Sequence, residues 1–236
     1  MKLRCLFHIH TWHSPDCLLS PRKVVFLARE AGADILVVTD HETSRGSEAV
    51  RRAAQGHPRF VIPAGEYKTE RGDVIGLFLQ REIQSRRSNE VVEEIRMQGG
   101  LIVLPHPFKG HRLDTEFVGK MDLIETYNSR CSPEQNESAA ALARSLSKPE
   151  IGGSDAHCAG EISAVLTEFE TDSSVSESDL PAIFRRAPRT LQFSPVSKIY
   201  QPYSGMIKAC RTYDFLLFGY QLKRMLSVAS KELFSS

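Results

Sequence analysis

Residues 7–16 read FHIHTWHSPD and follow the first apolar run of the chain, so they lie where a strand gives way to a loop. Side chains two positions apart on a strand point to the same face. His8 and His10 can therefore direct both imidazoles to one point, as a metal site at a strand end requires. Asp16 adds a carboxylate from the loop. Because His-x-His pairs also occur by chance, the prediction depends on whether later strands end in ligands too.

The composition is that of an ordinary globular chain. Its 236 residues suit one large domain, or one domain with an appendage, and can bury a sizeable core. A net charge of +1 offers no general argument for nucleic-acid binding, although a nucleotide substrate is compatible with it. The five cysteines form no C-x-x-C pair and are interpreted as free thiols of a reducing compartment. No signal peptide or bilayer-spanning stretch fits, so we expect a cytoplasmic protein.

Strand and helix patterns alternate along the chain. Strands are predicted at residues 3–11, 34–39, 59–66, 73–79, 101–107, 121–125 and 164–169. Helices are predicted at 21–31, where Ser20 is the expected N-cap, at 88–97, where Ser88 is, and at 133–146 and 180–186. Residues 171–180, rich in Ser and Asp, predict a loop. This alternation indicates right-handed βαβ units around a parallel sheet.

From about Pro195 the character of the chain changes. Residues 206–228 are apolar and aromatic, with scattered Lys and Arg. We predict a C-terminal helical tail that packs on the preceding domain or on a second subunit, which would make a homo-oligomer. A helix that docks on a membrane surface or a partner is the alternative.

Ligand-type residues stand at the end of strand after strand. They are His8 and His10, Asp40 and His41, Glu66, His106, Glu125 and Asn128, and Asp155 and His157. In closed α/β barrels the loops that follow the strands converge at one end. Imidazoles combined with carboxylates favour Zn, Mn or Fe. Because the set exceeds one tetrahedral site, we expect two or three metals and a bridging carboxylate, for which Glu66 is our choice.

These motifs resemble those of the PHP (polymerase and histidinol phosphatase) family of metallohydrolases. The resemblance covers roughly residues 3–170 and is carried, in the family's order, by FHIHTWHSPD, VVTDHET, PAGEYKTERGDVIGLFL, LIVLPHPF, LIETYNSR and GGSDAH. It implies a distorted (β/α)7 barrel with up to three metals and phosphoester hydrolysis. We accordingly expect a barrel over residues 1–194 and a helical tail over residues 195–236.

The resemblance also implies a set of metal ligands. The first metal would be held by His8, His10, Glu66 and Asp155, the second by Glu66 and His106, and the third by Asp16, His41 and His157. The chain departs from the family at Leu6, where an acidic residue is frequent, and at Asp73, where many members have a histidine. Where some members complete the second site with a histidine, this chain offers Glu125 and Asn128.

Substrate-facing residues are predicted from chemistry. Arg130 lies just past a strand end and suits a bidentate grip on phosphate, and Asn128 is a second donor to the same group. A water activated by metals across Glu66 would be the nucleophile. Lys109 and His111 are more readily interpreted as surface residues, and Asp40 as a structural carboxylate.

Three hypotheses follow. The first is a metal-dependent phosphoesterase whose substrate is a small phosphorylated metabolite, a nucleotide or a nucleic-acid end, with nucleic acid as substrate only. The alternative keeps the site but cleaves a carbamate, amide or ester. A third, a regulatory module with a vestigial site, conflicts with a ligand set that is intact.

Overall fold

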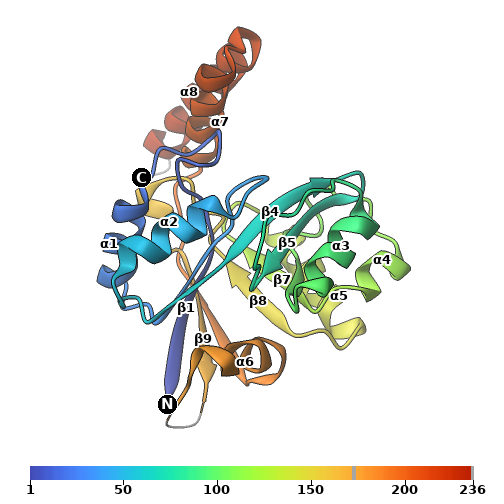
Figure 1. Cartoon of the computed structure of the whole chain (residues 1–236). Helices are drawn as coiled ribbons and strands as arrows, with labels where there is room; N and C mark the ends of the chain where they lie inside the picture. Colours follow the sequence, from blue (N-terminus) through green and yellow to red (C-terminus); the bar gives the residue numbers. More distant parts are fainter. Residues whose placement is uncertain (172–173, 235–236) are drawn as a thin grey trace.

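The computed structural model describes residues 1–171 and 174–234 and places their strands in two five-stranded sheets (Figure 1). The first has the order β10-β9-β1-β2-β3 and consists of β1 (Lys2–Ile9), β2 (Ile35–Val38), β3 (Phe60–Ile62), β9 (Val165–Glu170) and β10 (Arg189–Phe193). The second has the order β4-β5-β6-β7-β8 and consists of β4 (Ala64–Thr69), β5 (Gly72–Leu77), β6 (Leu101–Leu104), β7 (Leu123–Asn128) and β8 (Glu150–Gly153). The α/β class is confirmed, but both sheets are mixed, since β9 and β5 run antiparallel to their neighbours.

The strand predicted over residues 59–66 is divided at Pro63. Proline has no N–H to donate to a ladder, so it ends β3, which stays in the first sheet, while β4 begins the second. The sheets meet again at two isolated bridges, Ile9 with Ala156 and His41 with Glu66. The described strands therefore do not form the single closed sheet expected of a (β/α)7 barrel.

An apolar core lies between the two sheets. It takes buried side chains from strands of both, namely Leu3, Phe7, Val37, Ile75, Val103, Leu123 and Ile151. Burying each such side chain stabilises the fold by roughly 1.5–3 kcal/mol. This core holds the two sheets together and so brings the ends of their strands to one place.

Helices cover the outer faces of the sheets. The first sheet packs against α1 (Pro21–Glu30) and α2 (Arg45–Ala54), and the second against α3 (Ser88–Met97), α4 (Thr115–Gly119) and α5 (Pro133–Ser145). Ser20 caps α1 as predicted, because its hydroxyl accepts the Lys23 N–H over 3.2 Å. The predicted cap of α3 is wrong: Arg87 takes that position, and Ser88 donates its N–H and hydroxyl to Glu70.

The chain after residue 170 differs most from prediction. The predicted loop over 171–180 includes residues 172 and 173, which lie outside the described residues, and Glu177–Asp179 forms a short 3-10 turn, η2, before α6 (Leu180–Arg186). The strand β10 was not predicted. The single expected tail helix is two helices, α7 (Tyr200–Thr212) and α8 (Phe215–Phe234). They are divided at Tyr213, whose φ of 55° is left-handed, and the Asp214 carboxylate accepts the Leu217 N–H.

Figure 1 shows α7 and α8 as a hairpin that projects from the sheets. Among the helices of residues 1–171 and 174–234, none combines the length and apolar composition that crossing a bilayer needs.

Candidate metal centre

The Glu66 carboxylate lies at the centre of the predicted metal ligands. Its Oε1 is 3.2 Å from His106 Nε2 and 3.4 Å from His8 Nε2. Its Oε2 is 2.9 Å from His41 Nδ1 and 3.6 Å from His10 Nε2. Each oxygen therefore faces a different pair of imidazoles, which is the arrangement that a carboxylate shared between two cations needs.

Two aspartates extend the cluster on either side. Asp155 Oδ1 lies 3.5 Å from His10 Nε2 and 3.8 Å from His8 Nε2. Asp16, on the loop after β1, lies 3.4 Å from His41 Nε2 and 3.3 Å from His157 Nε2. The structure thus brings together all eight residues that the sequence analysis named as metal ligands.

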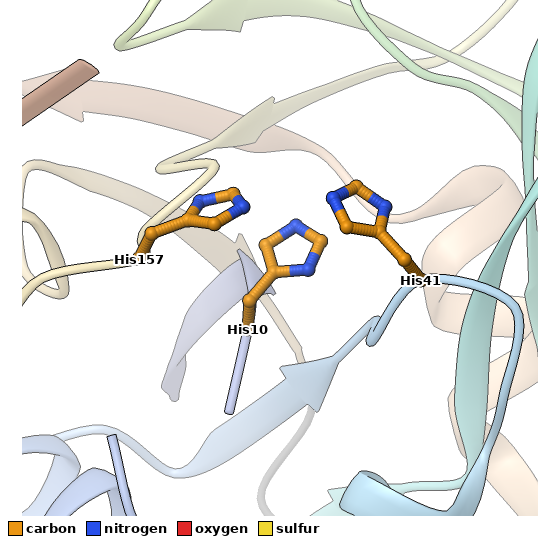
Figure 2. Close-up of side chains that lie close together, drawn as sticks. All are labelled: His10, His41 and His157. Carbon is orange, nitrogen blue, oxygen red and sulfur yellow. The ribbon is translucent and has the colours of Figure 1, made fainter. Parts of the chain in front are cut away.

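Figure 2 shows His10, His41 and His157 meeting from three separate segments of the chain. The ring centroid of His10 is 4.1 Å from that of His157 and 4.4 Å from that of His41. Three sets of ligand atoms lie close enough to share an ion: His10 with His41 and His157, His8 with Glu66 and His106, and His8 with His10 and Asp155. His10 therefore belongs to two of the three sets, whereas the family resemblance gives it to one metal.

Three of these ligand residues have strained backbones. His8, His106 and Asp155 have φ angles of 61°, 27° and 47°, which side-chain-bearing residues rarely adopt. Such strain costs of order 1–3 kcal/mol per residue and concentrates at functional sites.

The backbone at His8 also corrects the reason why the His8 and His10 side chains point to one place. The pairing of β1 with β2 shifts register between Leu6 and Ile9, so a local distortion, and not plain strand alternation, sets the direction of His8.

A hydrogen bond at Nδ1 orients each of three histidines. The Nδ1 atoms of His8 and His10 lie 2.7 Å from Glu125 Oε1 and 3.1 Å from Ser14 Oγ. His157 Nδ1 lies 2.9 Å from the Asp155 carbonyl. When Nδ1 carries the proton, the Nε2 lone pair of each ring points at the cluster, as metal-binding histidines require.

Asp40 supports the cluster indirectly, through the loop that follows β1. It accepts the Ser14 hydroxyl over 2.6 Å and the Thr11 N–H over 2.7 Å, so it holds the loop that follows β1. Its partners are those of a structural carboxylate.

Five buried polar atoms of the cluster have no hydrogen-bond partner: His8 Nε2, His10 Nε2, Asp16 Oδ1, Glu66 Oε2 and His106 Nδ1. Leaving a buried polar group unsatisfied costs roughly 1–3 kcal/mol, so native structures seldom do it repeatedly in one place. Four of the five atoms face the interior of the cluster. They are nitrogen and oxygen atoms of the kind that ligate metals, and one divalent cation can satisfy several of them together.

The electrostatics of the cluster are tightly balanced. Burial alone would lower the pKa of His8, but the carboxylates of Glu125, Glu66 and Asp155 hold it well above its ordinary value. Burial would raise the pKa of Glu66, but His8 and His41 hold it well below. The carboxylates thus need neighbouring positive charge, and a bound cation supplies that charge in place of protons on the imidazoles.

Comparison with known proteins agrees with this chemistry. A family model described as PHP-associated matches residues 133–187, which include Asp155 and His157. An uncharacterized protein of Methanocaldococcus jannaschii is 32% identical over 139 residues, which are 52% of this chain and 80% of that protein. A Bacteroides vulgatus protein containing a predicted PHP-like metal-dependent phosphoesterase superposes with a TM-score of 0.71 at 19% identity, covering 82% of this chain and 65% of its own. This chain belongs to the PHP family.

Three further proteins share part of the sequence or the fold. A second uncharacterized M. jannaschii protein is 36% identical over 122 residues, 47% of this chain and 52% of that one, so this chain spans about half its length. PsfC from Pseudomonas syringae shares the fold with a TM-score of 0.67 at 18% identity, covering 89% of this chain and 98% of PsfC. The lesion-specific endonuclease EndoQ from Pyrococcus furiosus does so with a TM-score of 0.58 at 16% identity, covering 81% of this chain and 58% of EndoQ.

The predicted phosphate ligand Arg130 has other partners in this PHP protein. Its Nε and Nη2 donate to the two carboxylate oxygens of Glu161, each over 2.8 Å, and its Nη1 donates to the Ser204 hydroxyl over 3.0 Å. Glu161 also accepts the N–H of His157 over 3.0 Å. Arg130 thus supports the segment that carries a metal ligand, and its guanidinium is committed to Glu161. Its role as a bidentate phosphate ligand stays a prediction.

The Lys109 side chain lies beside the cluster of candidate metal ligands, whereas the sequence analysis interpreted it as a surface residue. Its Nζ is 3.3 Å from Asp155 Oδ2. Asn128 Nδ2 donates to Glu125 over 2.9 Å and lies 3.5 Å from Asp155 Oδ2. The only sequence signal for Lys109 is its position three residues after His106, which is weak because basic residues are common in loops. His111 instead lies against the Asp73 carbonyl, 3.0 Å away.

Proposed function

We propose that this PHP protein is a metal-dependent phosphoesterase that hydrolyses a phosphate ester with a metal-activated water at a di- or trinuclear site. Its substrate would be a small phosphorylated metabolite, a nucleotide or a nucleic-acid end. The observation that carries the proposal is the cluster of buried, partnerless ligand atoms around Glu66. The likeness to an endonuclease keeps nucleic acid among the candidate substrates.

The roles follow from position. His8, His10 and Asp155 would hold one ion, His106 a second, and His41, Asp16 and His157 a third, with Glu66 shared between the first two. Two or three ions of Mn, Fe or Zn held there would supply positive charge that offsets the phosphoryl oxygens and would lower the pKa of a bound water to about 7.

Lys109 and Asn128 are the donors that we assign to the substrate. Both lie beside Asp155 at the edge of the cluster. An ammonium and a side-chain amide there can donate to a phosphoryl oxygen and orient the ester. We rank Lys109 ahead of Arg130 in this role, because Arg130 already donates to both carboxylate oxygens of Glu161 and to Ser204.

We also propose a division of labour along the chain. Residues 1–194 would form the catalytic unit, in which the two bridged sheets act as a distorted barrel, and residues 195–236 would form a tail with its own role. Both bridges lie beside metal-ligand candidates, so the architecture and the site would depend on the same contacts.

The test pairs activity with metal content. Purified protein supplied with Mn(II) is expected to hydrolyse an aryl phosphate and to retain bound transition metal. His10→Ala and Asp155→Ala should reduce the activity to background with the fold intact by circular dichroism. His13→Ala and His57→Ala change exposed histidines outside the cluster and should leave both readouts unchanged.

Two results would count against the proposal. One is wild-type protein without bound transition metal and without activity on any member of a phosphoester panel. The other is cleavage of an amide or carbamate panel with no phosphoester cleavage, which would establish the alternative bond.

A further inference from the structure

The tip of the C-terminal hairpin leaves large apolar side chains uncovered. We define the tip as residues 213–220, which join the end of α7 to the first turns of α8. Tyr213, Phe215 and Leu216 are 82%, 83% and 89% exposed, and Tyr220 is also exposed. Asp214, the acidic residue of the tip, accepts the Leu217 N–H at the start of α8. Contiguous exposed apolar groups of this kind mark interaction sites.

The same hairpin concentrates positive charge. Residues 195–236 contain six Lys or Arg residues and two Asp or Glu residues, a balance of +4 in a chain whose total is +1. Lys208, Arg211 and Lys223 are exposed and stand within two helical turns of the tip. An apolar tip with a basic surround matches an anionic, partly apolar partner.

The shape of the tip distinguishes a lipid surface from a second copy of the chain. Leu216 and Tyr220 are four residues apart and share one face of α8, whereas Phe215 points about 100° away from Leu216 around the helix axis. The exposed apolar surface is therefore wider than the single stripe that helix–helix packing uses. Two copies would also bring their basic residues together. A projecting tip that is apolar on several sides, with Tyr among its residues, fits the interface of a bilayer.

We propose that the tip docks on a bilayer that contains anionic phospholipid. Phe215 and Leu216 enter the interface, while Lys208 and Lys223 face the headgroups. Arg211 donates to the carbonyls of Trp12 over 3.1 Å and Ser14 over 2.8 Å, so the hairpin is attached to the loop between His10 and Asp16. Docking therefore holds the metal centre near the membrane surface, although binding itself does not depend on the proposed phosphoesterase activity.

Vesicle sedimentation tests this with the full chain. At low salt the wild type is expected to sediment with vesicles of phosphatidylglycerol and phosphatidylcholine and not with phosphatidylcholine alone. Phe215→Ser combined with Leu216→Ser should weaken binding more than about tenfold, and Lys208→Gln or Lys223→Gln about fivefold each. Met97→Ser, which changes an exposed methionine of α3, is the matched control and should bind as the wild type does.

The following results would contradict the proposal that the tip docks on a bilayer. The proposal fails if the wild type ignores anionic vesicles, or if the double tip variant binds as well as Met97→Ser does. A wild type that is dimeric by light scattering, with a monomeric tip variant and no vesicle binding, would assign the tip to a second copy. Circular dichroism of each variant verifies that the exposed substitutions leave the fold intact.

Discussion

The metal centre and the hairpin tip depart from the usual distribution of side chains in opposite directions. At the centre, His8, His10 and Glu66 bury polar atoms that have no hydrogen-bond partner. At the tip, Phe215 and Leu216 leave apolar surface in water. Unsatisfied buried polar atoms and exposed apolar patches are both unusual in folded proteins. Each exception matches the chemistry of a partner that we propose, a cation at the centre and an anionic bilayer at the tip.

The partners of buried polar groups also distinguish residues that stabilise the fold from residues that bind a ligand. Arg130 and Glu161 are buried polar groups too, but they satisfy each other. They belong to the scaffold, whereas the partnerless atoms belong to the site. The following experiments test that separation.

The largest loss of stability is expected when Arg130 is replaced. Arg130→Met leaves the Glu161 carboxylate buried and unpaired, which should lower the free energy of unfolding by about 3–5 kcal/mol in urea denaturation. Arg52→Met removes an exposed pair with Glu48 and should cost less than about 1 kcal/mol. If the two variants are equally mild, the Arg130 pair is not part of the scaffold.

The second-largest loss of stability is expected when bound metal is removed. An ion present at about a hundred times its dissociation constant stabilises the folded state by roughly 2.7 kcal/mol. Chelation should therefore lower the melting midpoint of the wild type by about 5–10 °C in calorimetry. The tip variant should show the same shift, and Asp155→Asn a smaller one. An unchanged wild-type midpoint would mean that the partnerless atoms do not hold an ion.

A smaller loss is expected at Glu125, which orients His8 without facing the cluster itself. Glu125→Gln should weaken Mn(II) affinity by about 10–100-fold in titration calorimetry. Glu125 accepts from His8 Nδ1 at one oxygen and from the His106 N–H and Asn128 Nδ2 at the other, and glutamine has only one acceptor oxygen for these donors. Glu93→Gln, at an exposed carboxylate of α3, is the matched control. Equal affinities in the two variants would remove Glu125 from the description of the site.

The smallest effect is expected at the tip. Phe215→Ser with Leu216→Ser should change the free energy of unfolding by no more than about 0.5 kcal/mol per substitution, since nothing in the described residues covers them. Leu123→Ala in the core should cost about 2–5 kcal/mol in the same assay. A tip variant as unstable as Leu123→Ala would show that the tip is packed in solution.

The sequence predicted which residues meet in the cluster better than it predicted their surroundings. His8, Glu66 and Asp155 could be found because ligand-type residues at successive strand ends are informative even without coordinates. Arg130 could not be placed, because its partner Glu161 lies 31 residues away and a salt bridge leaves no periodic pattern. The division of a predicted strand at Pro63 into two sheets, and the left-handed break at Tyr213, were missed for a related reason: the apolar pattern continues on both sides.

By itself the sequence determined the α/β class, the residues that meet in the polar cluster and the apolar, basic character of the C-terminal segment, because hydrophobic periodicity and residue chemistry are local properties. Only the tertiary structure decided which ligand-type side chains lie next to one another, which carboxylate Arg130 pairs with and which apolar residues remain exposed. Those outcomes depend on side chains far apart in the chain that meet only after the core between the two sheets has formed.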